Sequence, residues 1–255
     1  MKYKKLLVSI TCLLFITVAV FCLASAFKVT DIELKVESVE NSPENVASLC
    51  QDELLKHDGD NLLFLNVDDI SKSLSKLSGY VEVKKVKKEF PNKITVTVKE
   101  RVEAFTVFIN GKYYALDTDL TVLSEKQTNK NNVTQIENVL IEFSLADIDT
   151  NLKVGEKLKV YDEATANYLK NSASTLCDIN GSLQKISVSV RKDGVLYKTL
   201  TLKMKEGVIF NVLKADEKTV EKLNATYEFY LALENKGFGE YITVLEDNGK
   251  ITVKQ

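Results

Sequence analysis

The hydrophobic pattern begins with an uninterrupted apolar stretch near the N-terminus. Leu6 to Phe27 contains no charged residue, and a helix of that length would reach about 33 Å, enough to cross a bilayer core of about 30 Å. Lys2, Lys4 and Lys5 precede the stretch without an acidic residue among them. The positive-inside rule therefore predicts a cytoplasmic tail over residues 1–5, a single transmembrane helix over Leu6–Phe27 and an extracytoplasmic body.

A cleaved secretory signal is the alternative interpretation of the same stretch. Ala24-Ser25-Ala26 has the small-x-small pattern of a cleavage site. A signal sequence, however, usually contains only about 7–15 apolar residues, and this stretch is longer. The length favours an uncleaved anchor. Lipid attachment at Cys22 is not expected, because Phe21 is too large for the position before a lipidated cysteine.

Five elements are predicted in the first 75 or so residues after the apolar stretch. Period-two alternation predicts strands, and apolar residues at helical spacing predict two helices, the first capped by Ser42 and the second starting at Asn66. In chain order these are a strand over Val29–Glu37, helices over Ser42–Leu54 and Asn66–Leu77, and strands over Tyr80–Lys88 and Ile94–Lys99. Since each helix has one apolar stripe, both helices should cover one face of a three-stranded sheet.

The remainder of the chain predicts a second α+β domain with a mostly antiparallel sheet. Asn110-Gly111 lies between two alternating runs and is a strong hairpin signal. Asn248-Gly249 likewise lies between two alternating runs, near the C-terminus. The expected strands are Phe105–Ile109, Tyr113–Leu116, Thr121–Leu123, Val139–Phe143, Ile186–Val190, Leu196–Met204, Val208–Phe210, Tyr241–Leu245 and Ile251–Val253. Helices are expected over Tyr161–Cys177 and Glu217–Glu234, the latter buried through Val220, Leu223, Tyr227, Tyr230 and Leu231.

Composition excludes several classes of function. The net charge of −2 argues against nucleic-acid binding, which needs a basic excess to neutralise phosphates. Cys50 and Cys177 are far apart in the sequence and predict two buried thiols rather than a disulfide framework. His57 is the single histidine, so a His-rich metal site cannot form.

No motif predicts catalysis or a cofactor. Asp147-Ile148-Asp149-Thr150-Asn151 begins like a calcium loop but lacks its glycine and its final glutamate, which favours a solvated turn. Gly237-Phe238-Gly239 lacks the third glycine of a dinucleotide fingerprint. His57-Asp58 has no nucleophile placed beside it by any motif. We expect no enzymatic activity, no cofactor and no metal.

Four lysines form a basic run on one predicted strand, Lys84-Lys85 and Lys87-Lys88. A solvated sheet face explains this run. A contact with anionic lipid headgroups or with an acidic partner explains it as well, because a domain tethered close to a membrane stays near its surface. The sequence leaves both interpretations open.

Two segments of the first domain resemble a known family. Gly59-Asp60-Asn61-Leu62 is similar to the segment before the second helix of POTRA domains, and Val86 to Arg101 is similar to the strand-turn-strand run of the FtsQ/DivIB cell-division family, which ends in Glu-Arg. Three positions depart from the pattern. The glycine that often follows the family's first strand is replaced near Glu37-Ser38, Glu103 lies where the family often has proline, and Leu120 lies where glycine is frequent. The resemblance implies a POTRA domain over residues 28–101 and the family's β domain over residues 102–255.

What the resemblance implies is a non-catalytic scaffold of the divisome at the septum. The implied partners are FtsL-like and FtsB/DivIC-like division proteins, with an indirect link to septal peptidoglycan synthases, and the membrane is contacted through Leu6–Phe27. Two alternatives remain, an exported wall enzyme released after Ala26 and a POTRA-type chaperone module unrelated to division.

A partner-binding site is predicted at the C-terminal edge of the second sheet. A short terminal strand leaves backbone N–H and C=O groups that a partner strand can pair with. We expect Ile251 to Lys254 to form this edge. The expected contact residues are Tyr241, Val244, Leu245, Ile251 and Val253.

Overall fold

The structure is a computed structural model of the chain. It describes residues 10–18, 21, 25–39, 45–143, 145–183, 187–193, 197–204, 206–215, 217–233 and 241–254. A helix covers residues 10–18. No helix within the described ranges is both long and apolar enough to cross a bilayer. The expected span over Leu6–Phe27 falls partly outside these ranges, at residues 6–9, 19–20 and 22–24.

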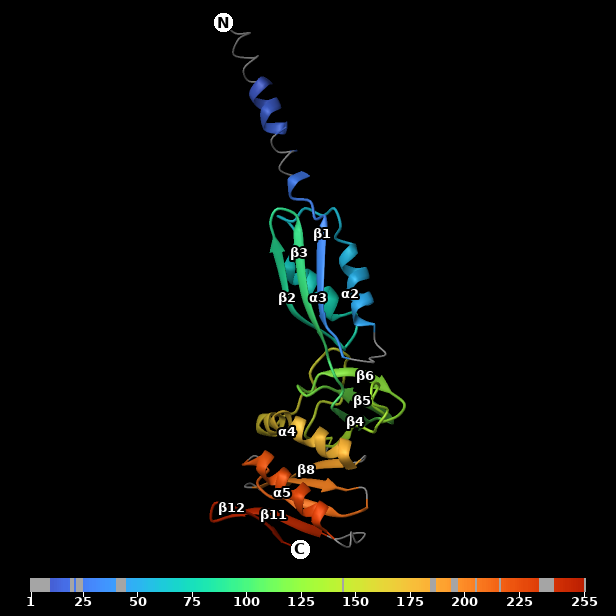
Figure 1. Ribbon diagram of the computed structural model, residues 1–255, viewed down its shortest axis with the longest axis vertical. Helices are drawn as coiled ribbons and strands as arrows, with labels where there is room; N and C mark the ends of the chain where they lie inside the picture. Colours follow the sequence, from blue (N-terminus) through green and yellow to red (C-terminus); the bar gives the residue numbers. More distant parts are fainter. Residues whose placement is uncertain are drawn as a thin grey trace. The chain divides into compact units, whose positions relative to one another are not determined.

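Contacts between residues divide the chain into two compact units, with the change from one to the other between Glu100 and Arg101. The first unit contains the five elements expected after the apolar stretch (Figure 1). They are β1 (Asp31–Glu37), α2 (Val46–Leu55), α3 (Val67–Ser75), β2 (Val81–Glu89) and β3 (Lys93–Glu100). The strand order is β1-β3-β2, with β1 parallel and β2 antiparallel to the central strand. This is the three-stranded, two-helix arrangement that the sequence predicts.

The core of the first unit lies between its sheet and its helices. Ile94, Val96 and Val98 on β3 are fully buried, as are Leu54 on α2 and Leu74 on α3. Since side chains on a strand alternate between faces, the residues between these positions point away from the helices. That second face of the sheet is polar and charged.

The lysine run lies on β2, and three of its side chains have local partners. Lys84 pairs with Glu82 at 2.7 Å and Lys87 with Glu89 at 2.9 Å, and Lys88 donates to the carbonyl of Leu63 at 3.3 Å. The hydrogen bond from Lys87 lowers the pKa of Glu89 below its usual value. These contacts favour the solvated-face interpretation over a dedicated site for anionic headgroups.

Asparagine residues cap both helices of the first unit. Asn45 Oδ1 accepts a hydrogen bond from Ser48 N, and Asn66 Oδ1 accepts one from Asp68 N, each at 3.0 Å. Asn66 therefore caps the second helix at the start that the sequence predicts. The expected cap at Ser42 is wrong, because the helix begins at Val46, and Ser42 itself lies outside the described residues. Asn satisfies the free N–H groups of the first turn as well as Ser does, so both are good candidates on sequence grounds.

The second unit is built on a nine-stranded sheet with the order β12-β11-β10-β9-β8-β7-β4-β5-β6. Its strands are β4 (Phe105–Ile109), β5 (Lys112–Leu116), β6 (Val122–Lys126), β7 (Val139–Glu142), β8 (Ser187–Asp193), β9 (Tyr197–Lys203), β10 (Ile209–Val212), β11 (Tyr241–Asp247) and β12 (Lys250–Lys254). Its helices are α4 (Glu163–Leu183) and α5 (Thr219–Ala232). All the strands expected from the alternation are present.

The sheet is mixed, so the expectation of a mostly antiparallel sheet needs correction. The pairs β4–β7, β7–β8 and β10–β11 are parallel. Two of these follow from the helices, because α4 lies between β7 and β8 in the chain and α5 lies between β10 and β11. A crossover helix returns the chain to the same end of the sheet, which makes the next strand parallel.

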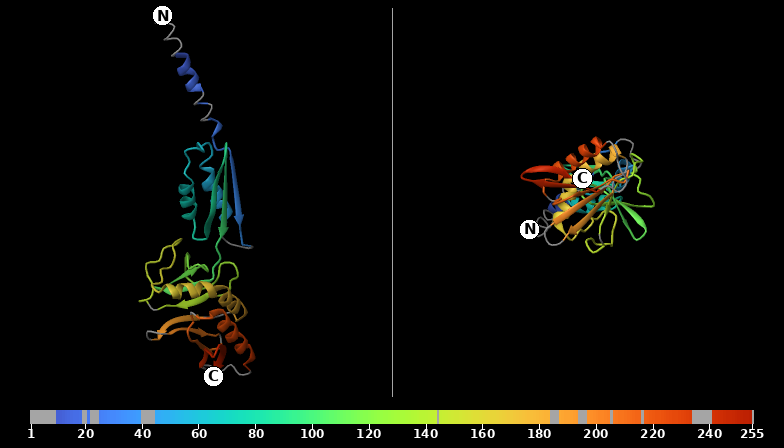
Figure 2. Two further views of the ribbon diagram at one scale, coloured as in Figure 1. Left: turned by 90° about the vertical axis from the view of Figure 1, so that its left-hand side faces the viewer. Right: turned by 90° about the horizontal axis from the view of Figure 1, so that it is seen from below.

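Helices α4 and α5 pack against each other on one face of this sheet (Figure 2). Beneath them lie fully buried side chains that include Phe105, Phe210 and Val244. The expected buried side of α5 is only partly right. Leu223 and Tyr230 are buried, but Val220 and Leu231 are 37% and 54% exposed. The other buried positions of α5 are Thr219, Lys222 and Thr226.

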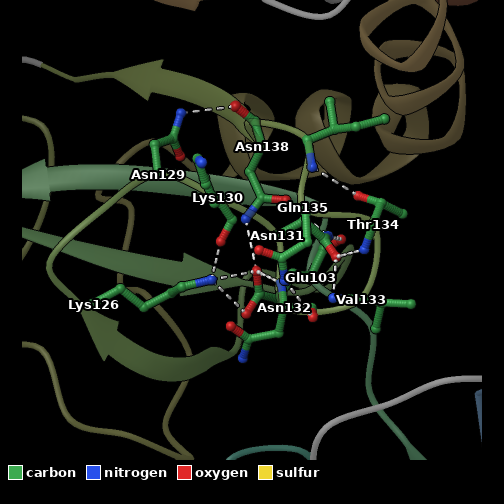
Figure 3. A network of polar contacts seen from close by, with 11 residues as sticks. Glu103, Lys126, Asn129, Lys130, Asn131, Asn132, Val133, Thr134, Gln135 and Asn138 are labelled. Atoms are coloured by element: carbon green, nitrogen blue, oxygen red, sulfur yellow. Dashed lines mark hydrogen bonds and ion pairs between the residues drawn. The ribbon is translucent and has the colours of Figure 1, made fainter.

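A buried polar network holds the loop between β6 and β7 (Figure 3). Its centre is Glu103, whose side chain is 2% exposed and pairs with Lys126 at 2.9 Å. Glu103 also accepts hydrogen bonds from the Asn138 side chain at 2.8 Å and from Asn132 N at 3.3 Å. Asn131 donates to the Glu103 carbonyl at 3.1 Å. The position where the family often has proline therefore carries the carboxylate that joins the start of this unit to the loop.

Cys50 and Cys177 are free thiols with limited access to solvent. Cys50 is fully buried and Cys177 is half-buried. Desolvation raises the pKa of each thiol from 9.0 to about 11. Since the folded state disfavours the thiolate, the stability that these groups contribute is complete below about pH 9 and is lost as the pH rises towards 11.

Thiol labelling checks this property. In a chain carrying Cys12→Ser and Cys22→Ser, we expect Cys50 and Cys177 to react with iodoacetamide at pH 8 about a hundredfold more slowly than after unfolding in guanidinium chloride, because the thiolate is the nucleophile. Reaction at the same rate in the folded and unfolded chain would contradict the burial of both thiols.

Candidate functional site

The edge predicted from the sequence exists, since β12 is the last strand in the order of the nine-stranded sheet. It pairs antiparallel with β11, with Val244 opposite Val253 and Glu246 opposite Ile251. Nothing else in the described part of the second unit pairs with the outer side of β12. The strand therefore presents backbone groups at the border of the sheet.

The turn between β11 and β12 sets the register of this hairpin. Asn248 and Gly249 have φ angles of 50° and 79°. Positive φ at both central residues is the type I′ turn, whose twist matches that of the strands and which favours Asn-Gly. A local signal of two residues thus fixes how the last strand pairs.

The same turn determines which backbone groups of β12 point outwards. In a two-residue hairpin the flanking residues, Asp247 and Lys250 here, exchange both hydrogen bonds. Hydrogen-bonded and non-hydrogen-bonded pairs then alternate along the ladder. By this alternation, the backbone N–H and C=O of Thr252 bond to β11. Those of Ile251 and Val253 point to the open side of the sheet.

The side chains of the predicted contact residues fall on two faces. Ile251 and Val253 are half-buried and pack against the core beneath α5, and Val244 on the same face is fully buried. Val244 therefore supports the edge from inside the core. Leu245 is half-buried on the opposite face, beside Thr252. The side chain of Tyr241 lies outside the described part.

Helix α5 adds residues that the sequence does not identify as part of the site. The helix contacts β10, β11 and β12, and Lys218 at its start pairs with Glu246 of β11 at 2.9 Å. Val220 and Leu231 are exposed and eleven residues apart, which is three helical turns, so they share one side of α5. Their apolar character made them look like core positions, and only the packing of α5 shows that they face solvent.

Lys222 fixes the loop that leads into α5. This lysine is fully buried, and its ammonium group donates to the carbonyls of Leu213 at 3.0 Å and Lys214 at 2.8 Å. Lys214 has a φ of 48°, a left-handed conformation that non-glycine residues adopt rarely. The buried cation therefore positions the turn after β10 and, through it, the helix beside the edge.

The opposite edge of the sheet, at β6, is covered where the strand begins. At β6, Val122 N donates to the carbonyl of Glu156 at 2.9 Å, and Gly155 N donates to the carbonyl of Val122 at 2.8 Å. Thr121 and Lys157 also form an isolated bridge. The loop before α4 thus pairs with the first residue of β6, whereas no such pairing is found on the outer side of β12 within the described residues.

The weak catalytic and metal signals have local explanations. The Asp147-to-Asn151 segment pairs with residues 159–161, where Tyr161 N donates to the Asp147 carbonyl at 2.9 Å. His57 Nδ1 lies 2.9 Å from Asp60 Oδ2 within one turn. No group of three or more potential metal-ligating side chains occurs among the residues that the structure describes.

Comparison with known proteins matches the first unit to a defined domain type. A family model described as "POTRA domain, FtsQ-type" matches residues 48–101. This range begins within α2 and ends directly after β3. It includes both segments on which the resemblance in the sequence depends.

Similarity over most of the chain is found to curated bacterial proteins named "Cell division protein DivIB". Those of Clostridium botulinum strains Hall and Loch Maree are each 26% identical, over 227 and 228 residues, and the alignments cover 85% of this chain and 84% of the relative. The protein of Clostridium tetani is 23% identical over 178 residues, 68% of this chain and 60% of the relative. The two longer alignments exceed either unit in length, so the similarity extends into both.

Proposed function

The chain belongs to the FtsQ/DivIB family of bacterial cell-division proteins, and on that premise we propose that it is a non-catalytic membrane scaffold that binds division partners through the β12 edge. The partners we propose are FtsL-like and FtsB/DivIC-like proteins, which would connect it indirectly to the septal peptidoglycan synthases. The single observation that carries this proposal is the open edge, with the backbone groups of Ile251 and Val253 directed outwards.

Strand addition is the binding mode that this geometry supports. An edge strand offers N–H and C=O groups that an extended partner segment can pair with, and neighbouring apolar side chains supply contact area. Val220 and Leu231 on α5 are exposed apolar groups of the helix that packs on β12. A partner that pairs with β12 and also contacts α5 would bury both.

Membrane attachment is the second part of the proposal. The uncharged stretch Leu6–Phe27 and the lysines before it support a single span with a cytoplasmic N-terminus and extracytoplasmic domains. Confinement to one bilayer raises the effective concentration of partners that are anchored in the same membrane. The septum is the location we expect for the assembled complex.

The test uses Val253→Pro in the full chain, with copurification and affinity of the DivIC-like partner as readouts. Proline removes an N–H that points to the open side, so we expect about a tenfold loss of affinity, the equivalent of one net hydrogen bond of about 1.4 kcal/mol. Val253→Ala is the matched control, because it also shortens the side chain but keeps the N–H. Equal affinity of the proline and alanine variants would exclude backbone pairing at this position.

A further inference from the structure

Three segments of the first unit meet at the end of the sheet where β1 begins (Figure 1). Leu62 N donates to the carbonyl of Phe27 at 2.7 Å, and Lys28 forms a bridge with Asn61. The turn between β2 and β3 joins them, because the Phe90 ring lies 5.9 Å from the Phe27 ring. Residues 25–28, 59–65 and 89–92 therefore form one structural tip, which we call the β1 tip.

The β1 tip exposes large apolar side chains. Phe64 is 86% exposed, Phe90 60% and Leu63 47%. Single exposed apolar residues are ordinary, but a group of them at one end of a small domain indicates a contact surface. This surface lies at the opposite end of the first unit from its junction with the second, since β3 runs from Lys93 at the tip to Glu100.

The exposure of Phe64 follows from a tight turn. Asn61 Oδ1 accepts from Leu63 N at 3.0 Å, and the Asn61 carbonyl accepts from Phe64 N at 3.1 Å. Leu62 is fully buried in the core. Because Leu62 and the two hydrogen bonds fix this turn, Phe64 cannot fold inwards without breaking them.

The apolar stretch that ends at the β1 tip indicates what the exposed side chains contact. Phe27 is the last residue of the uncharged stretch Leu6–Phe27, and its ring contacts Phe90. The exposed patch is thus continuous with the segment that we propose to cross the membrane. Charge does not point to an anionic partner, because the β1 tip contains one basic residue, Lys28, and two acidic residues, Asp60 and Glu89.

We infer that the β1 tip is seated in the lipid interface, with Phe64 and Phe90 inserted at the level of the headgroups and upper acyl chains. This inference rests on the proposed membrane attachment. Aromatic side chains are favoured at that depth, because the ring is removed from water at the headgroup level without entering the centre of the hydrocarbon core. Three points of contact, Phe27, Phe64 and Phe90, would restrict the tilt of the first unit on the membrane.

The chain contains no tryptophan, so single tryptophan substitutions report on single positions. The probes are Phe64→Trp and Phe90→Trp in the full chain, reconstituted in phosphatidylcholine vesicles. Lys76→Trp is the control, because Lys76 is exposed and follows the C-terminal end of α3, far along the unit from the tip. Flotation of the vesicles shows whether the chain is anchored, and circular dichroism shows whether each variant is folded.

We expect the two tip variants to show blue-shifted emission, protection from aqueous iodide and quenching by lipids brominated high on the acyl chain. The Lys76→Trp variant should show none of these. A chain that floats while the tip variants remain as accessible to iodide as the control would overturn this inference and leave the proposed function intact. A chain that fails to float would overturn both. If the tip tryptophans were protected from iodide only after a division partner is added, the lipid contact would be overturned in favour of a protein interface.

Discussion

We expect deletion of residues 248–255 to abolish copurification of the proposed DivIC-like partner while the first unit stays folded. The deletion removes β12 and its turn, and with them the outward backbone groups of Ile251 and Val253. Losing two to four intermolecular hydrogen bonds of about 1 kcal/mol each corresponds to a loss of affinity of about 30-fold to about 700-fold. Pull-down from membranes, with circular dichroism of the purified chain, measures the two effects.

A matched variant separates the backbone of β12 from its side chains. Lys250, Thr252 and Lys254 alternate with Ile251 and Val253 and point to the face away from α5. Replacing these three residues by alanine keeps every backbone group of the strand, so we expect partner binding to persist. Partner capture by the deleted chain, or its loss in the triple alanine variant, would refute pairing through the edge.

We expect Glu103→Ala to destabilise the second unit by about 3–5 kcal/mol, the cost of leaving one member of a buried ion pair without its partner. Lys126 is 12% exposed and would lose its carboxylate, and the side chain of Asn138 would lose an acceptor. For a unit of this size the loss corresponds to a fall in Tm of about 10 °C. Calorimetry of the full chain measures it.

Glu103→Gln is the control for this prediction. Glutamine has the same shape and can accept the hydrogen bond from Asn138, so we expect a smaller loss of stability than with alanine. A Glu103→Ala chain that melts at the wild-type temperature would show that the network in Figure 3 contributes no net stability. Partner binding should survive in the folded variant, because Glu103 lies by β4 and not by the β12 edge.

Signals that act over a few residues were sufficient to predict most of the elements. Asn110-Gly111 and Asn248-Gly249 adopt the positive φ angles of hairpin turns, because these dipeptides tolerate that conformation wherever they lie. The alternation of apolar and polar residues predicted the strands, including β12 as the last one. Leu120 adopts a φ of 63° at the position where glycine is frequent in the family. The family pattern therefore indicates the backbone conformation there even though the residue differs.

What the sequence alone determined, then, is the order of the helices and strands and the segment of the chain in which each forms, because these properties depend on neighbours along the chain. Only the tertiary structure decided the parallel pairs, the exposure of Val220 and Leu231, and the role of Glu103. It also brought Phe27, Leu62 and Phe90 together from three separate segments. These features depend on which elements become neighbours in space, and no local periodicity encodes that choice.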